Sequence, residues 1–221
     1  MKLTSVCVGA FVLLVQTLVG SSQGSRPQLL IDPVEAPVFI QEFNYVESEP
    51  PLVAAVLRVI PTSREKITTA AILITYWRQG RPVAGRIYPV YENALSGAVP
   101  LRIRLDFQRT RADSVVASVF KAQGPTLNWV LPSEHLRSLG RRLFPGVAMP
   151  QVPAAETVAP EPYNVRPASD NGCTITLGDC VAAARAACGE RGVGGVTFSP
   201  KTCTCCFYCS GELPADCGGD Q

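Results

Sequence analysis

The sequence contains a single histidine, His135, among its 221 residues. Imidazole is the side chain used most often for general base catalysis and is a frequent zinc ligand, so this scarcity excludes any site that needs two histidines. The zinc-protease motif H-E-x-x-H and the phosphate-loop ending G-K-[ST] are absent as well. His135 follows Ser133 and Glu134, where a lone histidine is more often solvated than catalytic. We therefore predict no catalytic residue, no metal and no cofactor, which favours a protein that is not an enzyme.

The chain also lacks a large net charge of either sign. The formal net charge is +2, and no basic run is interleaved with aromatic residues. Proteins that bind nucleic acid carry such basic patches, so nucleic acid is not an expected partner. Apolar residues make up 47% of the chain, which is enough for a packed core.

Long apolar runs are missing after the first 24 residues. Residues 6–18 are apolar apart from Gln16 and Thr17, follow the positive charge of Lys2, and precede small residues suited to cleavage. This run is shorter than the roughly 20 residues that a membrane-spanning helix needs. We predict a signal peptide over residues 1–24, no membrane span in the mature chain, and a secreted or periplasmic location.

Residues 25–147 contain seven short segments that are rich in Val, Ile, Thr and aromatic residues. The clearest is 101–107, in which every second residue is apolar and the others are charged, as in a half-buried strand. Segment 68–77 is apolar on both faces, which suits a central strand. Turn-forming residues separate the segments, so we predict an immunoglobulin-like β-sandwich in a mainly β protein. The seven segments are 38–46, 52–60, 68–77, 83–90, 101–107, 114–121 and 126–131.

Cysteine is absent between Cys7 and Cys173. The inter-sheet disulfide of antibody domains is therefore excluded, and this sandwich must be stable through its apolar core alone. Residues 133–144 break the strand pattern because leucines recur there at helical spacing. We predict a short amphipathic helix with Ser133 as its N-cap and with three arginines on a solvated face. These arginines are Arg137, Arg141 and Arg142.

Residues 148–172 form a proline-rich stretch without hydrophobic periodicity, in which Pro150, Pro153, Pro160, Pro162 and Pro167 recur. Such a composition is typical of an extended spacer between two modules. Proteolytic cleavage within it is an alternative that stays open at this point.

Eight of the nine cysteines lie between residues 173 and 217. A unit of about 45 residues buries too little apolar surface to fold without additional links. We therefore predict that residues 173–221 form a small disulfide-rich α+β module with four bridges, each stabilising it by about 2–4 kcal/mol. Eight thiols allow about 105 pairings, and the spacing does not decide among them. The disulfide candidates are Cys173, Cys180, Cys188, Cys203, Cys205, Cys206, Cys209 and Cys217.

The residues between these cysteines indicate one helix and one hairpin. The alanine-rich run between Cys180 and Cys188 favours a helix, with Asp179 as N-cap and Gly189 just beyond its end. Residues 192–195 are predicted to form a turn, and 196–198 and 202–208 to form the strands. Two helix cysteines on one stripe can pin the helix to the hairpin. We also predict that the neighbours Cys205 and Cys206 do not pair with each other.

Two alternatives use the C-x-x-C pair formed by Cys206 and Cys209. Zinc would fit this spacing, but structural zinc sites usually have two such pairs, often with histidine. Thiol redox catalysis uses C-x-x-C at the start of a helix, whereas here the motif ends a strand. In an exported protein disulfides are the favoured interpretation.

These observations favour an exported, non-catalytic binding or adhesion protein whose partner is an unknown macromolecule or a surface glycan. One alternative is a thiol-disulfide redox protein that acts through Cys206 and Cys209. The other is a toxin-like module that is released from its carrier by cleavage in the linker.

Overall fold

Two β-sheets and two longer helices form the fold in the computed structural model, which describes residues 26–46, 53–96, 99–105, 107–146 and 173–213. The chain is mainly β, as predicted, whereas the immunoglobulin-like assignment stays a prediction. The large sheet contains β1 (Gln28–Ile31), β7 (Ser114–Gln123), β4 (Thr69–Arg78), β5 (Arg81–Tyr91), β10 (Thr204–Cys209) and β9 (Val193–Ser199) in that order, with β8 (Asn128–Val130) paired to β7. The small sheet contains β2 (Val38–Val46), β3 (Val53–Pro61) and β6 (Leu101–Leu105).

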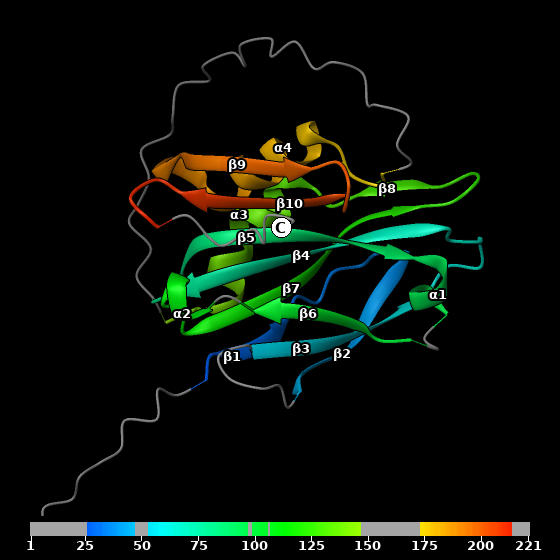
Figure 1. The fold of residues 1–221 in the computed structure, drawn as a ribbon, viewed down its shortest axis with the longest axis horizontal. Helices are drawn as coiled ribbons and strands as arrows, with labels where there is room; N and C mark the ends of the chain where they lie inside the picture. The colour runs from blue at the N-terminus through cyan, green and yellow to red at the C-terminus, as the bar shows by residue number, and fades with distance from the viewer. Residues whose placement is uncertain (1–25, 47–52, 97–98, 106, 147–172, 214–221) are drawn as a thin grey trace, which may run out of the picture.

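The helices in the described residues lie at strand ends or on one face of the large sheet (Figure 1). Short helices follow β5 and β6, and a 3-10 turn follows the last α-helix. The helices are α1 (Glu92–Leu95), α2 (Phe107–Thr110), α3 (Ser133–Leu143), α4 (Leu177–Cys188) and η1 (Gly189–Arg191).

Strand β4 shows how the layers are built. It lies between β7 and β5 in the large sheet, which confirms its prediction as a central strand. Ile72, Ile74 and Tyr76 point from one face into the core that the large sheet shares with the small sheet. Leu73 and Trp77 point from the other face into a second core beneath α3 and α4. Because side chains alternate along a strand, one apolar strand serves two cores, and the fold has three layers.

All seven segments predicted as strands in residues 25–147 are strands, with their ends shifted by a few residues. Segment 101–107 is shorter than predicted, because the strand ends at Leu105 and α2 begins at Phe107. Strand β1 was not predicted. Its four residues pair in parallel with β7, more than eighty residues away, and such a short segment shows no period of its own.

The cysteine-rich segment is not packed apart from the two sheets. Strand β10 pairs antiparallel with β5, so the hairpin β9–β10 extends the large sheet, and α4 packs beside α3. The predicted turn at 192–195 is largely wrong, since β9 begins at Val193. The predicted domain boundaries stay predictions. Among the described residues, no helix has both the length and the apolar character needed to cross a membrane.

Close packing of a glycine against an aromatic ring seats β10 on β5. Gly85 lies directly opposite Phe207, whose side chain is almost completely buried. A Cβ atom built on Gly85 would collide with the Phe207 ring. Glycine at this position therefore leaves the space that the ring occupies.

Gly85→Ala should lower the free energy of unfolding by about 1–3 kcal/mol, because an added methyl group overfills a packed core. Gly146→Ala is the matched control, since a Cβ there would meet nothing within 4 Å. Urea unfolding followed by circular dichroism measures both variants. Equal unfolding midpoints for the two variants would contradict this account of the β5–β10 contact.

Tyr45 holds the segment before β1 against the small sheet. Its hydroxyl donates a hydrogen bond of 2.6 Å to the carbonyl oxygen of Pro27, and the Arg26 guanidinium lies 5.4 Å from the ring centre. Burial raises the pKa of Tyr45 above its usual value, and the charge of Arg26 lowers it by less. The folded state therefore favours the protonated phenol.

Tyr45→Phe should lower the free energy of unfolding by about 1 kcal/mol near neutral pH, because a hydrogen bond is lost. The raised pKa means that Tyr45 contributes fully below about pH 10 and loses its contribution as the pH rises through the folded-state pKa. The difference between wild type and variant should therefore shrink from pH 9 to pH 11 in urea titrations. A constant difference over that range would show that ionisation of Tyr45 is not linked to folding.

Candidate functional site

Among the described residues, three disulfides fasten the C-terminal segment together. Cys180–Cys205 and Cys188–Cys209 join α4 to β10, and Cys173–Cys203 joins the residues just before α4 to the turn before β10. The prediction that the helix is pinned to the hairpin through its two cysteines is confirmed. Cys205 is bonded to Cys180, so the prediction that it does not pair with its neighbour is also confirmed.

Spacing explains why two bridges can run side by side from α4 to β10. Cys180 and Cys188 are eight residues apart on a helix, a rise of about 12 Å. Cys205 and Cys209 are four residues apart on a strand, a rise of about 13 Å, and an even separation puts both on one face. The two bridges therefore match in length, and that face of β10 is turned toward the helix.

The start of α4 is fixed by a capping box. Thr176 is the N-cap, and its hydroxyl accepts a hydrogen bond of 3.2 Å from the Asp179 backbone amide, while the Asp179 carboxylate accepts one of 2.9 Å from the Thr176 amide. The prediction of Asp179 as the N-cap was therefore wrong by three residues. The Lys121 ammonium group on β7 lies 3.1 Å from the same carboxylate, which ties the helix to the large sheet.

The C-x-x-C pair does not form a dithiol in this structure. Residues three apart on a strand face opposite sides, and Cys209 is bonded to Cys188. Cys206 is buried, and Cys217 lies outside the described residues. In the described ranges, no group of three or more His, Cys, Asp or Glu side chains is arranged to hold a metal ion.

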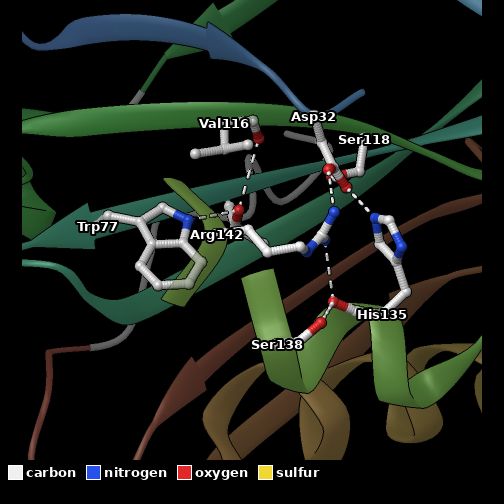
Figure 2. Close-up of polar contacts among 8 residues, drawn as sticks. Asp32, Trp77, Val116, Ser118, His135, Ser138 and Arg142 are labelled. Atoms are coloured by element: carbon white, nitrogen blue, oxygen red, sulfur yellow. Dashed lines mark hydrogen bonds and ion pairs between the residues drawn. The ribbon is translucent and has the colours of Figure 1, made fainter. Parts of the chain in front are cut away.

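A buried carboxylate, Asp32, joins the end of β1 to α3 (Figure 2). Its side chain is completely buried, and His135 Nε2 lies 2.9 Å from Oδ2. The Ser118 hydroxyl on β7 donates a hydrogen bond of 3.0 Å to the same oxygen. Arg142 Nη1 lies 3.3 Å from Oδ1 as an ion pair without hydrogen-bond alignment. Three partners from two elements therefore surround one carboxylate.

Arg142 and His135 are not the solvated side chains that the sequence suggested. Arg142 also donates a hydrogen bond of 3.1 Å from Nη2 to the His135 carbonyl oxygen, and only a third of its side chain is exposed. The physical reason is the position of Asp32, which places a buried negative charge under one side of α3. Arg137 does face solvent, as predicted, and pairs with exposed Glu134.

The cluster holds α3 in place, and its two serine hydroxyls are not placed as in a nucleophilic site. A catalytic Ser-His-Asp arrangement places the hydroxyl on the imidazole nitrogen away from the carboxylate. Here the Ser118 hydroxyl is bonded to Asp32 itself, and the Ser138 hydroxyl donates to the His135 carbonyl oxygen. The nearby Trp77 indole donates to Thr75 Oγ1 at 2.7 Å and packs against Phe144 at the end of α3.

A cavity of about 210 Å³ lies at the end of the large sheet where β4 meets the residues that follow β10. Three arginines and one glutamate line it, together with the apolar side chains of Val83 and Leu213. Arg78 Nη2 donates to both Glu212 carboxylate oxygens, at 2.8 and 2.7 Å. Arg191 Nη2 approaches the same carboxylate at 3.2 Å. The other lining arginines, Arg109 and Arg111, flank the end of α2 and are exposed.

Comparison of the chain with protein-family models, with curated proteins and with solved structures found no match.

Sequence reasoning missed both charged clusters. Asp32 precedes a proline after four strand residues, a pattern that fits any turn. Arg78 and Glu212 are 134 residues apart, so nothing local connects them. The available signal was that Arg78, Arg109 and Arg111 all lie in short stretches between predicted strands, Arg78 after segment 68–77 and the other two between 101–107 and 114–121.

Arg142→Met should lower the free energy of unfolding by about 1–3 kcal/mol, because it removes a cation from a fully buried carboxylate. Arg137→Met is the matched control on the same helix and should change it by less than about 0.5 kcal/mol, since the Arg137–Glu134 pair is exposed. Thermal and urea unfolding of both variants measure the difference. Equal effects of the two substitutions would contradict a special role for the Asp32 cluster.

Proposed function

We propose that this chain is an exported, non-catalytic binding or adhesion protein whose partner is a macromolecule or a surface glycan. In this proposal the immunoglobulin-like sandwich is a rigid support, and the loops and cavity at one end of the large sheet form the contact surface. The predicted signal peptide accounts for export, and the oxidising compartment outside the cytosol allows the thiols to pair.

The observation that carries the proposal is the way in which the disulfides fasten the C-terminal segment onto the sandwich. Two bridges join α4 to β10, and β10 is itself a strand of the large sheet. A surface built on such a framework keeps its shape without a partner, and a preorganised surface loses less conformational entropy on binding.

The redox alternative receives less support. It requires that Cys206 and Cys209 form a disulfide with each other, but Cys209 is bonded to Cys188. Both cysteines also lie on β10, which is hydrogen-bonded to β5 on one side and to β9 on the other. The released-toxin alternative is also less favoured. Strand β10 lies between β5 and β9, so release of the C-terminal segment would expose one edge of the sandwich sheet.

The test is to express the full chain in a secreting host and to measure the intact mass of the exported protein before and after alkylation without reductant. We expect loss of the leader and no alkylation of the six cysteines paired in the structure. A reactive Cys206/Cys209 dithiol that reduces a disulfide substrate would support the redox alternative instead. Cleavage within residues 148–172 that yields an active fragment would support the toxin alternative.

Binding is tested with the same exported protein on immobilised glycans and on cell surfaces. We expect saturable binding without chemical change of the partner. The matched control is protein that has been reduced and alkylated, which should lose binding because the C-terminal bridges hold the surface in place. Turnover of a defined small substrate would contradict the proposal.

A further inference from the structure

We propose that the arginine-lined cavity binds an oxyanion group, such as a sulfate, phosphate or carboxylate, and that Arg109 and Arg111 are its contacts. This inference rests on the proposed function, because it identifies the chemical group of the partner that the cavity receives.

The charge balance of the cavity is positive. Its lining holds three guanidinium groups and one carboxylate, and that carboxylate already pairs with Arg78 and with Arg191 outside the lining. Glu212 is mostly buried by these contacts, with 12% of its side chain exposed. The remaining positive charge belongs to Arg109 and Arg111. Guanidinium groups bind oxyanions through paired charge-assisted hydrogen bonds, which makes an anionic group the matching ligand.

The acid nearest to Arg111 along the chain does not neutralise this charge from within the cavity. Asp113 follows Arg111 by two residues but does not line the cavity. Its carboxylate accepts a hydrogen bond of 2.6 Å from the Gln79 amide and another of 3.0 Å from the Ser114 hydroxyl. Asp113 thereby joins the turn that follows Arg78 to the residues after α2, which include Arg111.

The residues around Arg78 and Arg111 are held together firmly. The backbone amide of Asp113 donates a hydrogen bond of 2.9 Å to the Trp77 carbonyl oxygen, so the residues after α2 are fastened to the β4–β5 hairpin by backbone and side chain alike. Gln79 has φ +52° and Arg111 has φ +50°, both in the left-handed region that is uncommon for residues other than glycine. Such conformations persist where the surroundings fix them, and they cluster at ligand sites.

Cavity size limits the ligand. A volume of about 210 Å³ is below the ~300–1,000 Å³ that is usual for drug-sized molecules. The cavity therefore receives an acidic group and a few attached atoms, and the rest of the ligand extends outward. Leu213, which is 63% exposed, and Val83 provide an apolar wall for the attached atoms.

The test begins with inorganic sulfate, titrated into the full mature chain at constant ionic strength with chloride as the balancing ion. Isothermal calorimetry and amide chemical shifts should show one saturable site at the cavity. The Arg109→Ala/Arg111→Ala variant should lose about tenfold or more in affinity, because two charge-assisted contacts are removed. Glu212→Gln should bind sulfate more tightly than wild type, since a competing negative charge is removed.

The matched control is Arg64→Ala/Lys66→Ala, which also removes two positive charges. These residues precede β4, whereas Arg78 ends it, so they lie about 30 Å from the cavity along a strand. The control should bind sulfate as wild type does. Equal loss in both double variants would show nonspecific charge attraction and would overturn the inference, as would no change in the Arg109/Arg111 variant.

A second arm distinguishes the source of the oxyanion and separates this inference from the proposed function. A sulfated oligosaccharide that binds wild type more tightly than sulfate, and fails to bind the Arg109/Arg111 variant, supports a glycan-borne group. Sulfate binding without any macromolecular or glycan partner leaves the anion site in place and contradicts the proposed function. Unchanged partner binding by the Arg109/Arg111 variant contradicts the anion site and leaves the proposed function in place.

Discussion

The pairing of β10 with β5 is the contact on which the rest of the structure depends. It joins the C-terminal segment to the large sheet through backbone hydrogen bonds, and the disulfides to Cys180 and Cys188 carry that connection across to α4. Helix α4 in turn contacts α3 and covers the apolar face of the large sheet. Without β10, α4 would lose both of its covalent links to the sheet, and the residues that follow β10 would no longer close the arginine-lined cavity.

The contacts of a buried carboxylate position α3, as the disulfides position α4. Asp32 is fully buried and interacts with His135 and Arg142, which lie two turns apart on α3. A buried carboxylate is unfavourable unless charged and polar groups compensate it, so the arrangement fixes the helix in one position. The two helices on the same face are thus positioned by different chemistry. Lys121 and Asp179 add an ion pair between β7 and the first turn of α4.

The sequence predicted most strands because alternation is a local property. Segment 38–46 matches β2 at both ends, and the two-sided character of β4 correctly indicated a central position. The features that failed depend on partners far away in the chain. Strand β1 is recognisable only through its pairing with β7. Phe107 was predicted as a strand residue because the alternation of segment 101–107 includes it, although α2 begins there.

The candidate sites were less predictable than the fold for the same reason. The equal lengths of eight helix residues and four strand residues explain the pairing of Cys180 with Cys205 and of Cys188 with Cys209, but only after α4 and β10 are known to lie side by side. Asp32 and Arg142 are separated by more than a hundred residues, and neither is distinctive by itself. Periodicity identifies elements, whereas charged clusters depend on how the elements pack.

Strand β5 has a further consequence for how the chain is made. It ends at Tyr91, and the strand that covers its outer edge begins only at Thr204. During synthesis β5 is therefore an uncovered sheet edge until more than a hundred further residues have been made. Its sequence suits that interval, since Pro82 and Pro89 bracket the stretch that later pairs with β10, and Arg86 lies within it. Proline and charge on an open edge discourage pairing with other chains, so β5 is protected from aggregation until its own partner arrives.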